Sequence, residues 1–267
     1  MNYTRDELMV ALLAREIRDG ELVFQGAASP MALVAIELAR RTHARNASYL
    51  SLLGANPDPI NMDDIINFRP VKVTGYFNLF DLWDFIQKGY IDLEFIRPAQ
   101  IDQYGNINNT VVGTYEKPSV RFPGGIAICD ASLLIGRIVL YVTKHAKRTF
   151  VEKVDFVTAR GGGEWRRQYE YGIGPARVIT PLAVFGFEKD GRIKVDSIHE
   201  GVSGDELIQN TGFAIEIPEE TPTTKPPTEE EMRHISEIDP YGFRQIEFPE
   251  LRPKVMAKMA EVMLAPK

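Results

Sequence analysis

Apolar residues recur with helical spacing near the start of the chain, from Leu8 to Ile17. Thr4 followed by Glu7 has the pattern of a capping box, in which each side chain bonds the other residue's backbone N–H at a helix N-terminus. Gly20 is the residue type that commonly follows a helix C-terminus. The pattern therefore predicts an amphipathic helix between Thr4 and Gly20.

Strand-like and helix-like segments then alternate as far as residue 97. Strands are predicted for residues 21–25, 49–53 and 91–96, and helices for residues 30–41 and 78–88. Ser29 and Pro30 suit an N-cap and a first helical position, and Gly89 closes the other helix. Because such alternation is typical of an open parallel or mixed sheet flanked by helices, we predict an α/β fold.

Short strands dominate the second half of the chain. They are predicted at residues 110–115, 125–129, 135–142, 154–158, 179–187 and 192–198. Asp190-Gly191, between the last two, is a typical hairpin turn. A helix at residues 202–210, a proline-rich surface loop at 217–229 and a last helix capped by Thr228 follow. Without a repeat or a clear boundary, residues 1–267 are expected to form a single domain with a β-rich second half.

Composition narrows the class of protein. The 267 residues carry a formal net charge of -6, which argues against nucleic acid or an anionic membrane as the main partner. The first residues lack a signal-peptide pattern, and no apolar run approaches the ~20 residues of a membrane-spanning helix. The single cysteine, Cys129, excludes an internal disulfide and fits a reducing compartment. We therefore expect a cytoplasmic protein.

Two segments have residues suited to binding or catalysis. Residues 101–109 combine Asp, Gly and Asn at a density typical of a tight turn whose side chains bond the backbone. Residues 121–132 contain Gly124 and Gly125, which let a backbone approach a ligand and present its N–H groups. From residue chemistry alone, a purely structural role stays open for both segments.

Other candidates are weaker. The turn at residues 26–30 leads into a helix N-terminus that can attract an anion, but a plain strand-to-helix turn is favoured. No dinucleotide-binding or P-loop glycine motif is present. The loop at residues 161–167 is interpreted as solvated, and Cys129 as a small buried side chain. The four histidines are interpreted as surface residues without metal-ligand spacing, so neither a metal site nor a bound cofactor is expected.

A family resemblance rests on several motifs. Residues 101–108 have the pattern Ile-Asp-x-Tyr-Gly-Asn-x-Asn, residues 147–158 look like the strand Arg-Arg-Phe-x-x-Lys-x-Asp-Tyr-Val-Thr, and residues 210–213 and 238–240 match C-terminal landmarks. On these motifs, residues 5–245 resemble the β-type chain of family I CoA-transferases, as found in glutaconate CoA-transferase. The resemblance implies the CoA-transferase fold and chemistry on an acyl-CoA thioester, with coenzyme A as part of the substrate.

One position departs from the family pattern. In the family, the strand before the glycine turn ends in Glu-Ser-Gly, and its glutamate attacks the thioester. An ungapped reading from Arg41 to Gly54 places Leu52 at that glutamate. Leucine cannot act as a nucleophile, a base or a proton donor. The related methylglutaconyl-CoA decarboxylase carries a cysteine there, and Cys129 is elsewhere. No residue of this chain is therefore assigned a certain catalytic role.

The resemblance also implies a set of binding residues. Gly124 and Gly125 correspond to a family Gly-Gly-Ala loop whose amides stabilise the developing oxyanion, although the loop is shorter here. The implied substrate- or CoA-binding positions are Gly54, Asn106, Asn108, Gly124, Gly125 and Ile126.

Three functional classes follow. The first is a β subunit that acts with an α-type chain in an αβ or α2β2 assembly. Because Leu52 replaces the nucleophilic glutamate, the resemblance favours a variant that hydrolyses the thioester or cleaves a C–C bond, similar to the steroid ring-opening CoA-thioester hydrolase. An apolar side chain at this position also leaves room for a bulky or alicyclic acyl group. A transferase whose carboxylate comes from the α-type chain is the alternative. The second class is a non-catalytic acyl-CoA-binding or structural subunit. The third, a sugar-phosphate isomerase or sensor, is disfavoured by the CoA-transferase motifs.

Overall fold

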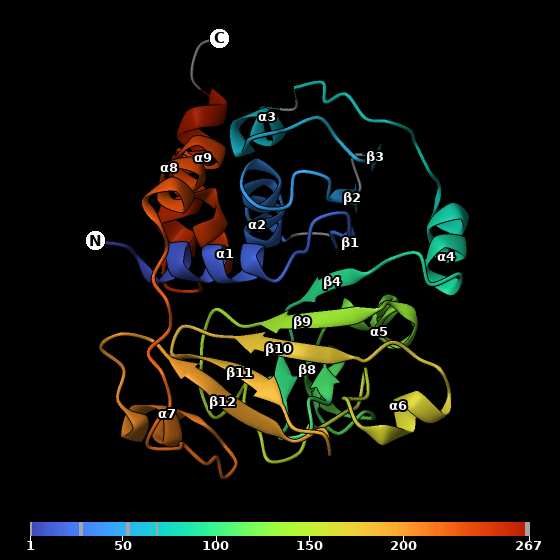
Figure 1. Ribbon diagram of the computed structural model, residues 1–267, viewed down its shortest axis with the longest axis vertical. Helices are drawn as coiled ribbons and strands as arrows, with labels where there is room; N and C mark the ends of the chain where they lie inside the picture. The colour runs from blue at the N-terminus through green and yellow to red at the C-terminus, as the bar shows by residue number, and fades with distance from the viewer. Residues whose placement is uncertain (1, 27–28, 52–53, 68, 265–267) are drawn as a thin grey trace. The chain divides into compact units, whose positions relative to one another are not determined.

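The computed structural model describes residues 2–26, 29–51, 54–67 and 69–264 (Figure 1). The described chain packs into two compact units. The first combines the residues up to 83 with those from 226 onward, and the second comprises residues 84–225. The first unit is therefore built from both ends of the chain.

Helices dominate the first unit. Its helices are α1 (Arg5–Arg15), α2 (Pro30–Arg41), α3 (Met62–Ile66), α8 (Glu229–Ile238), the 3₁₀ helix η2 (Phe243–Glu247) and α9 (Arg252–Leu264). α1, α2 and α8 pack on one another, and η2 packs on α2 and α9. β1 (Leu22–Phe24) runs parallel to β2 (Ser48–Ser51), which pairs antiparallel with β3 (Gly54–Ala55). The predicted helices at the start of the chain and the predicted strand at residues 21–25 are confirmed. The predicted strand at residues 49–53 is confirmed up to Ser51, and residues 52 and 53 lie outside the described residues.

The predicted capping boxes are present in this unit. The Thr4 N–H donates to Glu7 Oε2 (2.7 Å) at the start of α1. At α8 the Thr228 N–H donates to Glu231 Oε2 (2.7 Å), and the Glu231 N–H donates to Thr228 Oγ1 (3.1 Å). These bonds satisfy N–H groups that a helix N-terminus otherwise leaves unpaired.

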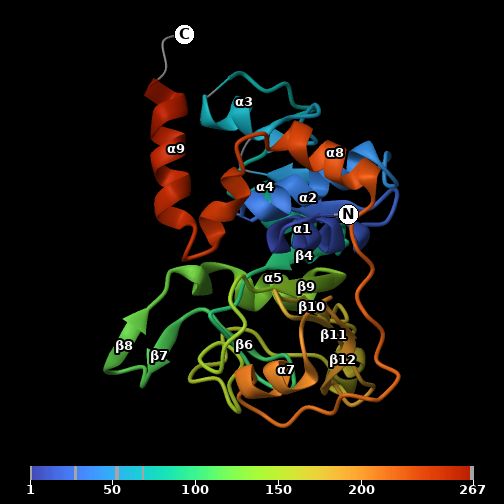
Figure 2. The same cartoon turned by 90° about the vertical axis from the view of Figure 1, so that its left-hand side faces the viewer.

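The expectation that the helix after Thr228 is the last one is wrong. α9 follows it and runs toward the C-terminus (Figure 2). Among the residues of α9, only Val255 is buried. The segment therefore lacks the broad apolar stripe by which a sequence reveals a surface helix.

The second unit contains a mixed sheet. Its strands are β4 (Leu93–Ile96), β9 (Arg137–Tyr141), β10 (Pro175–Ile179), β11 (Ala183–Phe187) and β12 (Ile193–Ile198). β9 lies between β4 and β10 and is parallel to both, whereas β10, β11 and β12 pair antiparallel in that order. Gly191, with φ +88°, forms the predicted hairpin turn between β11 and β12. The α/β fold with a β-rich second half is therefore confirmed.

The remaining elements of the described chain are short. They are α4 (Leu79–Gln87), which crosses the boundary between the units, β5 (Gln100–Ile101), β6 (Ile107–Asn108), β7 (Val111–Gly113), β8 (Pro118–Arg121), η1 (Gly124–Ile126), α5 (Ile128–Leu134), α6 (Glu164–Gln168) and α7 (Gly204–Asn210). β5 pairs with β6, and β7 pairs with β8 in a hairpin that projects away from β9 to β12 in Figure 2.

Three predicted strands are wrong. Residues 125–129 belong to η1 and α5, because the short apolar run there fits a helix as well as a strand. Residues 154–158 form no strand in the structure as described. Residues 179–187 are two strands, since the chain turns at Thr180, whose Oγ1 accepts the N–H groups of Leu182 and Ala183.

Two histidines and the cysteine also differ from expectation. His145 is buried, stacked on the Phe150 ring at 4.0 Å between centroids, and bonded to the hydroxyls of Thr180 and Thr211 (both 3.1 Å). Burial lowers the pKa of His145 to about 3, so the ring is neutral. His199 is also buried, so the surface interpretation is wrong for both. Cys129 is exposed on α5 rather than buried.

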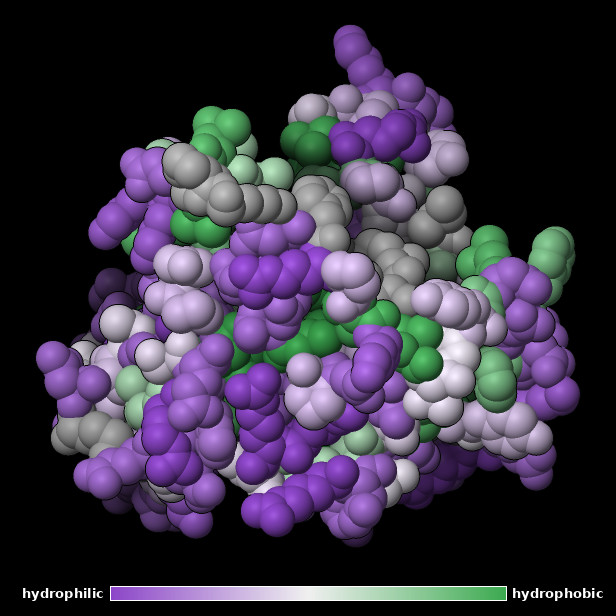
Figure 3. Space-filling model, turned by 90° about the horizontal axis from the view of Figure 1, so that it is seen from above, coloured by the Kyte–Doolittle hydropathy of each residue, from purple (hydrophilic) through white to green (hydrophobic). Residues whose placement is uncertain are grey.

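The face of the molecule seen in Figure 3 is mainly hydrophilic, with hydrophobic residues in a few patches. Across the described ranges, no helix combines the length and the apolar character needed to cross a bilayer.

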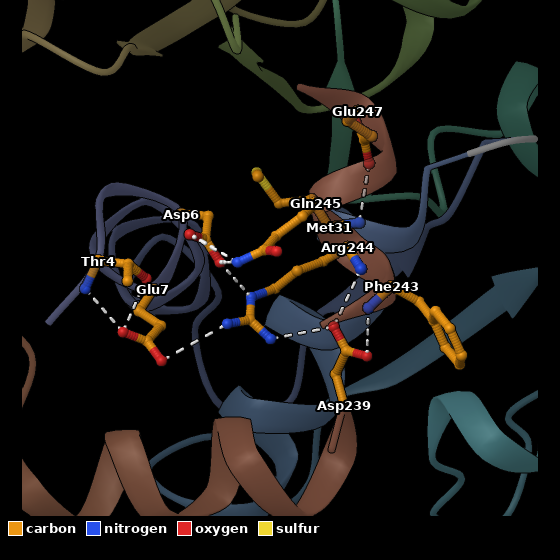
Figure 4. Close-up of polar contacts among 9 residues, drawn as sticks. All are labelled: Thr4, Asp6, Glu7, Met31, Asp239, Phe243, Arg244, Gln245 and Glu247. Carbon is orange, nitrogen blue, oxygen red and sulfur yellow. Dashed lines mark hydrogen bonds and ion pairs between the residues drawn. The ribbon is translucent and has the colours of Figure 1, made fainter. Parts of the chain in front are cut away.

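A buried ionic cluster joins the two ends of the chain in the first unit (Figure 4). Arg244 Nε donates to Asp6 Oδ2 (2.8 Å), and Arg244 Nη1 donates to Asp239 Oδ2 (3.0 Å). The side chains of Arg244 and Asp6 are each 5% exposed, and that of Asp239 is fully buried. Asp239 also accepts the Phe243 N–H (2.8 Å), so the cluster ties α1, the end of α8 and η2 together.

Buried carboxylates need their cation. Arg244→Met leaves Asp6 and Asp239 buried without a counter-charge, and we expect it to lower the free energy of unfolding by about 3–5 kcal/mol. Urea denaturation of the purified chain measures this. The control is Arg233→Met, because the Arg233 side chain on α8 is 63% exposed and its ion pairs are worth at most about 1 kcal/mol. Equal losses for the two variants would contradict the expectation.

Glu94 on β4 is an unusual core residue. Its side chain is buried, and among the described residues its Oε2 has no hydrogen-bond partner. Burial raises the pKa of Glu94 to about 8, so the group is mainly protonated at neutral pH.

The raised pKa of Glu94 predicts a pH-dependent stability. Between the unfolded pKa of 4.5 and the folded pKa of about 8, unfolding releases a proton. Stability is therefore lost as the pH rises through this window, with a slope of at most about 1.4 kcal/mol per pH unit. We expect Glu94→Gln to remove this slope in denaturation at several pH values, whereas Glu206→Gln, at an exposed position on α7, leaves it. A slope that survives in Glu94→Gln would refute the assignment.

Candidate functional site

The segment 101–109 is a turn organised by one carboxylate. Asp102 Oδ1 accepts the N–H groups of Tyr104 (3.0 Å) and Asn106 (3.1 Å), and Asp102 Oδ2 accepts Nδ2 of Asn106 (2.9 Å). Gly105 has φ +71°, and a Cβ there would lie 2.7 Å from the Phe187 ring. The density of Asp, Gly and Asn in the sequence thus indicates the observed turn.

Asn106 and Asn108 use their amides within the protein. Asn106 Oδ1 accepts the Gly161 N–H (2.9 Å). Asn108 is fully buried: its Nδ2 donates to Gln100 Oε1 (2.7 Å) and to the Val111 carbonyl (2.5 Å). These bonds give both asparagines a structural role, since they hold the turn and its neighbours in place. A contact of either with the substrate or coenzyme A stays a prediction.

The turn continues into a polar platform formed by Asn109, Thr110 and Thr158. The Asn109 N–H donates to Thr158 Oγ1 (2.8 Å), and the hydroxyls of Thr110 and Thr158 are 2.7 Å apart. The Asn109 side chain also accepts the Ala99 N–H (2.7 Å). Residues from two distant parts of the sequence therefore form one fixed surface.

Gly124 and Gly125 lie directly against this platform. A Cβ on Gly124 would be 2.9 Å from Asn109 Cβ, and one on Gly125 would be 2.9 Å from Thr110 Oγ1. Contacts this short do not occur for real side chains, so the packing requires glycine at both positions. The structure thus places Gly124 and Gly125 against the two residues that directly follow Asn108, whereas Asn106 and Asn108 bond elsewhere in the second unit.

The backbone donors of the two glycines are available. Gly124 and Gly125 form the start of η1, where N–H groups have no partner within the helix. Within the part of the chain that the structure describes, neither N–H group donates a hydrogen bond. Both residues are partly exposed. Two adjacent free amides on a rigid support have the composition of an oxyanion-binding site.

The platform beneath these glycines was not predicted from the sequence. Asn109 and Thr110 directly follow the matched motif at residues 101–108, and Thr158 is the last residue of the matched motif at residues 147–158. This closeness to two matched motifs was the available signal, but spacing alone does not show which motifs pack together.

Gly54 belongs to the first unit. It has φ +135° and pairs with Ser51 across the β2–β3 hairpin. A Cβ at Gly54 would lie 2.9 Å from the Val73 side chain. Leu52 and its neighbour Leu53 lie outside the described residues, as does the side chain of Ile126. The placement of Leu52 at the family glutamate therefore stays a prediction.

The loop at residues 161–167 holds a buried cation, so its interpretation as solvated is wrong for Arg166. The Arg166 guanidinium is buried and donates to the carbonyls of Gly161 (2.9 Å), Ser132 (2.8 Å), Gly172 (3.0 Å) and Arg160 (2.7 Å). Burial, followed by the neighbouring Arg160 charge, lowers the pKa of Arg166 to about 10. Arg166 thus fastens this loop to α5.

Among the described residues, no group of three or more His, Cys, Asp or Glu side chains is arranged to hold a metal ion.

Comparison with known proteins places these features in a family. The sequence model of the coenzyme A transferase family matches residues 7–210. The β-type chain of 3-oxoadipate CoA-transferase from Pseudomonas knackmussii is 34% identical, with 89% of this chain and 94% of that protein covered. The IpdB subunit of the cholesterol ring-cleaving hydrolase of Mycobacterium tuberculosis is 26% identical, with 91% and 98% covered.

Solved structures agree with these sequence relatives. The decarboxylase AibA/AibB has a chain with a TM-score of 0.78 and 30% identity, covering 91% of this chain and 98% of that chain. The chain therefore belongs to the coenzyme A transferase family.

Proposed function

We propose that this chain is the β-type subunit of an enzyme that acts on an acyl-CoA thioester together with an α-type chain, as αβ or α2β2. Similar proteins are named as the second of two kinds of subunit, and the solved decarboxylase is named for two chains. Coenzyme A enters as part of the substrate, and no other cofactor takes part. We place the assembly in the cytoplasm.

The free amides of Gly124 and Gly125 carry this proposal. Attack on a thioester moves negative charge onto the carbonyl oxygen, and preorganised N–H donors lower the barrier by stabilising that charge. The platform of Asn109, Thr110 and Thr158 supports these donors through hydrogen bonds that are complete without a ligand. The donors therefore need little rearrangement when charge develops.

Leu52 defines the type of reaction. Covalent CoA transfer through a glutamyl intermediate requires a carboxylate, which leucine lacks. The catalytic carboxylate is then supplied by the α-type chain, and water or a C–C bond cleavage replaces the usual acceptor step. The names of two relatives, a ring-cleaving hydrolase subunit and a decarboxylase, support such a variant.

Two alternatives remain within the family. A transferase with a carboxylate from the α-type chain would exchange CoA between acids, and a non-catalytic subunit would bind acyl-CoA without turnover. Labelled carboxylic acids distinguish transfer from hydrolysis, because only transfer places the label in a new thioester.

The need for a partner is the first test of this function. We expect the purified chain to show no thioester turnover on a panel of linear, alicyclic and steroid acyl-CoA probes, and to gain activity when co-expressed with an α-type chain. Free thiol release measures turnover, and light scattering measures the assembly. A monomer with full activity would refute the two-chain proposal.

Substitution at position 52 tests the placement of the acyl group. In the assembly, Leu52→Glu is expected to abolish turnover of the acyl-CoA identified in that screen, because the added bulk and charge crowd the acyl group. Burial in an apolar pocket would also raise the pKa of the new carboxyl and weaken it as a nucleophile. We therefore expect only a weak CoA adduct, detected by intact mass after borohydride reduction.

The matched control is Leu52→Gln, which has nearly the same shape as the glutamate variant but no carboxylate. It should lose turnover in the same way and form no adduct. Unchanged turnover in both variants would show that position 52 does not face the acyl group.

A further inference from the structure

Two arginines in the loop after Thr158 lie against one aromatic ring. The guanidinium carbons of Arg160 and Arg166 are 4.2 and 4.9 Å from the centre of the Trp165 ring. Trp165 is itself held in place, because its Nε1 donates to the Gly162 carbonyl (3.0 Å). All of these residues belong to the second unit. The indole therefore brings two positive charges close together within that unit.

The two arginines differ in what their side chains contact. Arg166 is 1% exposed, and its acceptors within the described chain are backbone carbonyls, which are neutral. Arg160 is exposed, and within the described ranges its guanidinium makes no hydrogen bond or ion pair. No carboxylate of the described chain therefore pairs with either arginine.

Two neighbouring cations without an anion are an unfavourable arrangement. Burial, followed by the charge of Arg160, lowers the pKa of Arg166, so the two positive charges repel each other. A buried charge is ordinarily paired with an opposite charge, and carbonyl groups supply only partial charges in its place. An anion bound to the free donors of Arg160 would attract both guanidinium groups and offset their repulsion. The arrangement thus favours an anionic ligand.

The surroundings of Arg160 indicate where such a ligand binds and what it contains. The cavity lined by both arginines has a volume of about 10 Å³, which is room for one water molecule and too little for a phosphate group, so the anion binds on the solvent side of Arg160. Tyr171 extends the aromatic surface, since its ring is 6.0 Å from that of Trp165 and it is 36% exposed. Guanidinium groups bind phosphates through paired donors, and aromatic rings stack on nucleobases. The cluster therefore suits a phosphorylated nucleotide.

This cluster begins two residues after the platform of the candidate site. A Cβ on Gly125 would lie 3.9 Å from Thr158 Cγ2, so Thr158 borders the glycine amides. The Cα atoms of Thr158 and Arg160 can be at most about 7 Å apart, because they are two residues apart in the chain. In coenzyme A, a long and flexible pantetheine arm separates the thioester from the phosphates. One molecule is therefore long enough to reach from Gly125 to Arg160.

We propose that Arg160, held against the Trp165 ring, binds the phosphate groups in the nucleotide half of coenzyme A, and that Tyr171 offers a stacking surface for the adenine. This inference rests on the proposed function, in which coenzyme A is part of the substrate. It adds the residues that hold coenzyme A at a distance from the thioester. The second unit alone supplies this phosphate site.

The test measures ligand binding by the assembly with its α-type partner. Arg160→Gln removes the charge and keeps the backbone carbonyl that Arg166 uses, and Arg160→Lys keeps the charge but loses the paired donors. The matched control is Arg167→Gln, because Arg167 lies in the same loop, its side chain is 77% exposed, and it pairs with Glu164 (3.3 Å). Titration calorimetry gives Kd for coenzyme A and dephospho-coenzyme A directly, and for pantetheine by competition.

The loss of affinity should depend on the phosphates of the ligand. For Arg160→Gln we expect binding of coenzyme A to weaken about 10-fold, because charge-assisted bonds to phosphate are lost. Binding of pantetheine, which has no phosphate, should not change. Arg160→Lys should lose less affinity, and Arg167→Gln should match the parent assembly. Equal losses for coenzyme A and dephospho-coenzyme A assign Arg160 to the diphosphate, whereas a loss for coenzyme A alone assigns it to the 3′-phosphate.

Other outcomes overturn the phosphate site. Unchanged affinity for coenzyme A in Arg160→Gln does so directly. Equal weakening of coenzyme A and pantetheine does so because it shows damage to the loop, and equal weakening in Arg160→Gln and Arg167→Gln does so because it shows a general effect of charge.

The proposed function fails in a different way. A parent assembly that binds coenzyme A through Arg160 and turns over no acyl-CoA probe keeps the phosphate site and overturns the catalytic proposal. Turnover by the parent assembly with no change in coenzyme A affinity in Arg160→Gln keeps the catalytic proposal and overturns the phosphate site. A parent assembly without affinity for coenzyme A overturns both.

Discussion

The close contact of two glycines with a polar platform is the constraint on which the candidate site depends. Gly124 and Gly125 approach Asn109 and Thr110 at distances that leave no space for a Cβ. Because Thr158 fixes both platform residues by hydrogen bonds, the position of the glycine backbone is defined before any ligand arrives. Within the described residues, the N–H groups of both glycines donate no hydrogen bond, so they stay available to a ligand.

Much of the architecture follows from local sequence signals. The capped helices that begin after Thr4 and Thr228 and the Asp190-Gly191 hairpin were predictable because their chemistry lies within a few residues. The run at residues 125–129 was not, because a short apolar segment fits a strand or a helix and only its tertiary surroundings decide. α9 was missed because it buries so little that its sequence carries no periodic signal.

The buried polar groups show the limit of prediction more sharply. Arg166 was interpreted as part of a solvated loop, yet it donates to four backbone carbonyls, and carbonyls have no sequence signature. His145 is bonded to Thr180 and Thr211, which are remote in sequence. The candidate site is a similar case. The sequence motifs identified Gly124 and Gly125, but the hydrogen bond between Thr158 and Thr110 that supports them could be recognised only from the structure.

The site separates binding from chemistry. An oxyanion-binding pair of amides serves hydrolysis, transfer and decarboxylation equally, because each begins with a thioester carbonyl that needs polarisation. In the proposed function, the residue at position 52 selects among them, since a carboxylate there permits a covalent intermediate and Leu52 does not. A change of reaction in this family therefore does not require a new scaffold. In the proposed function, it requires one changed side chain, at position 52.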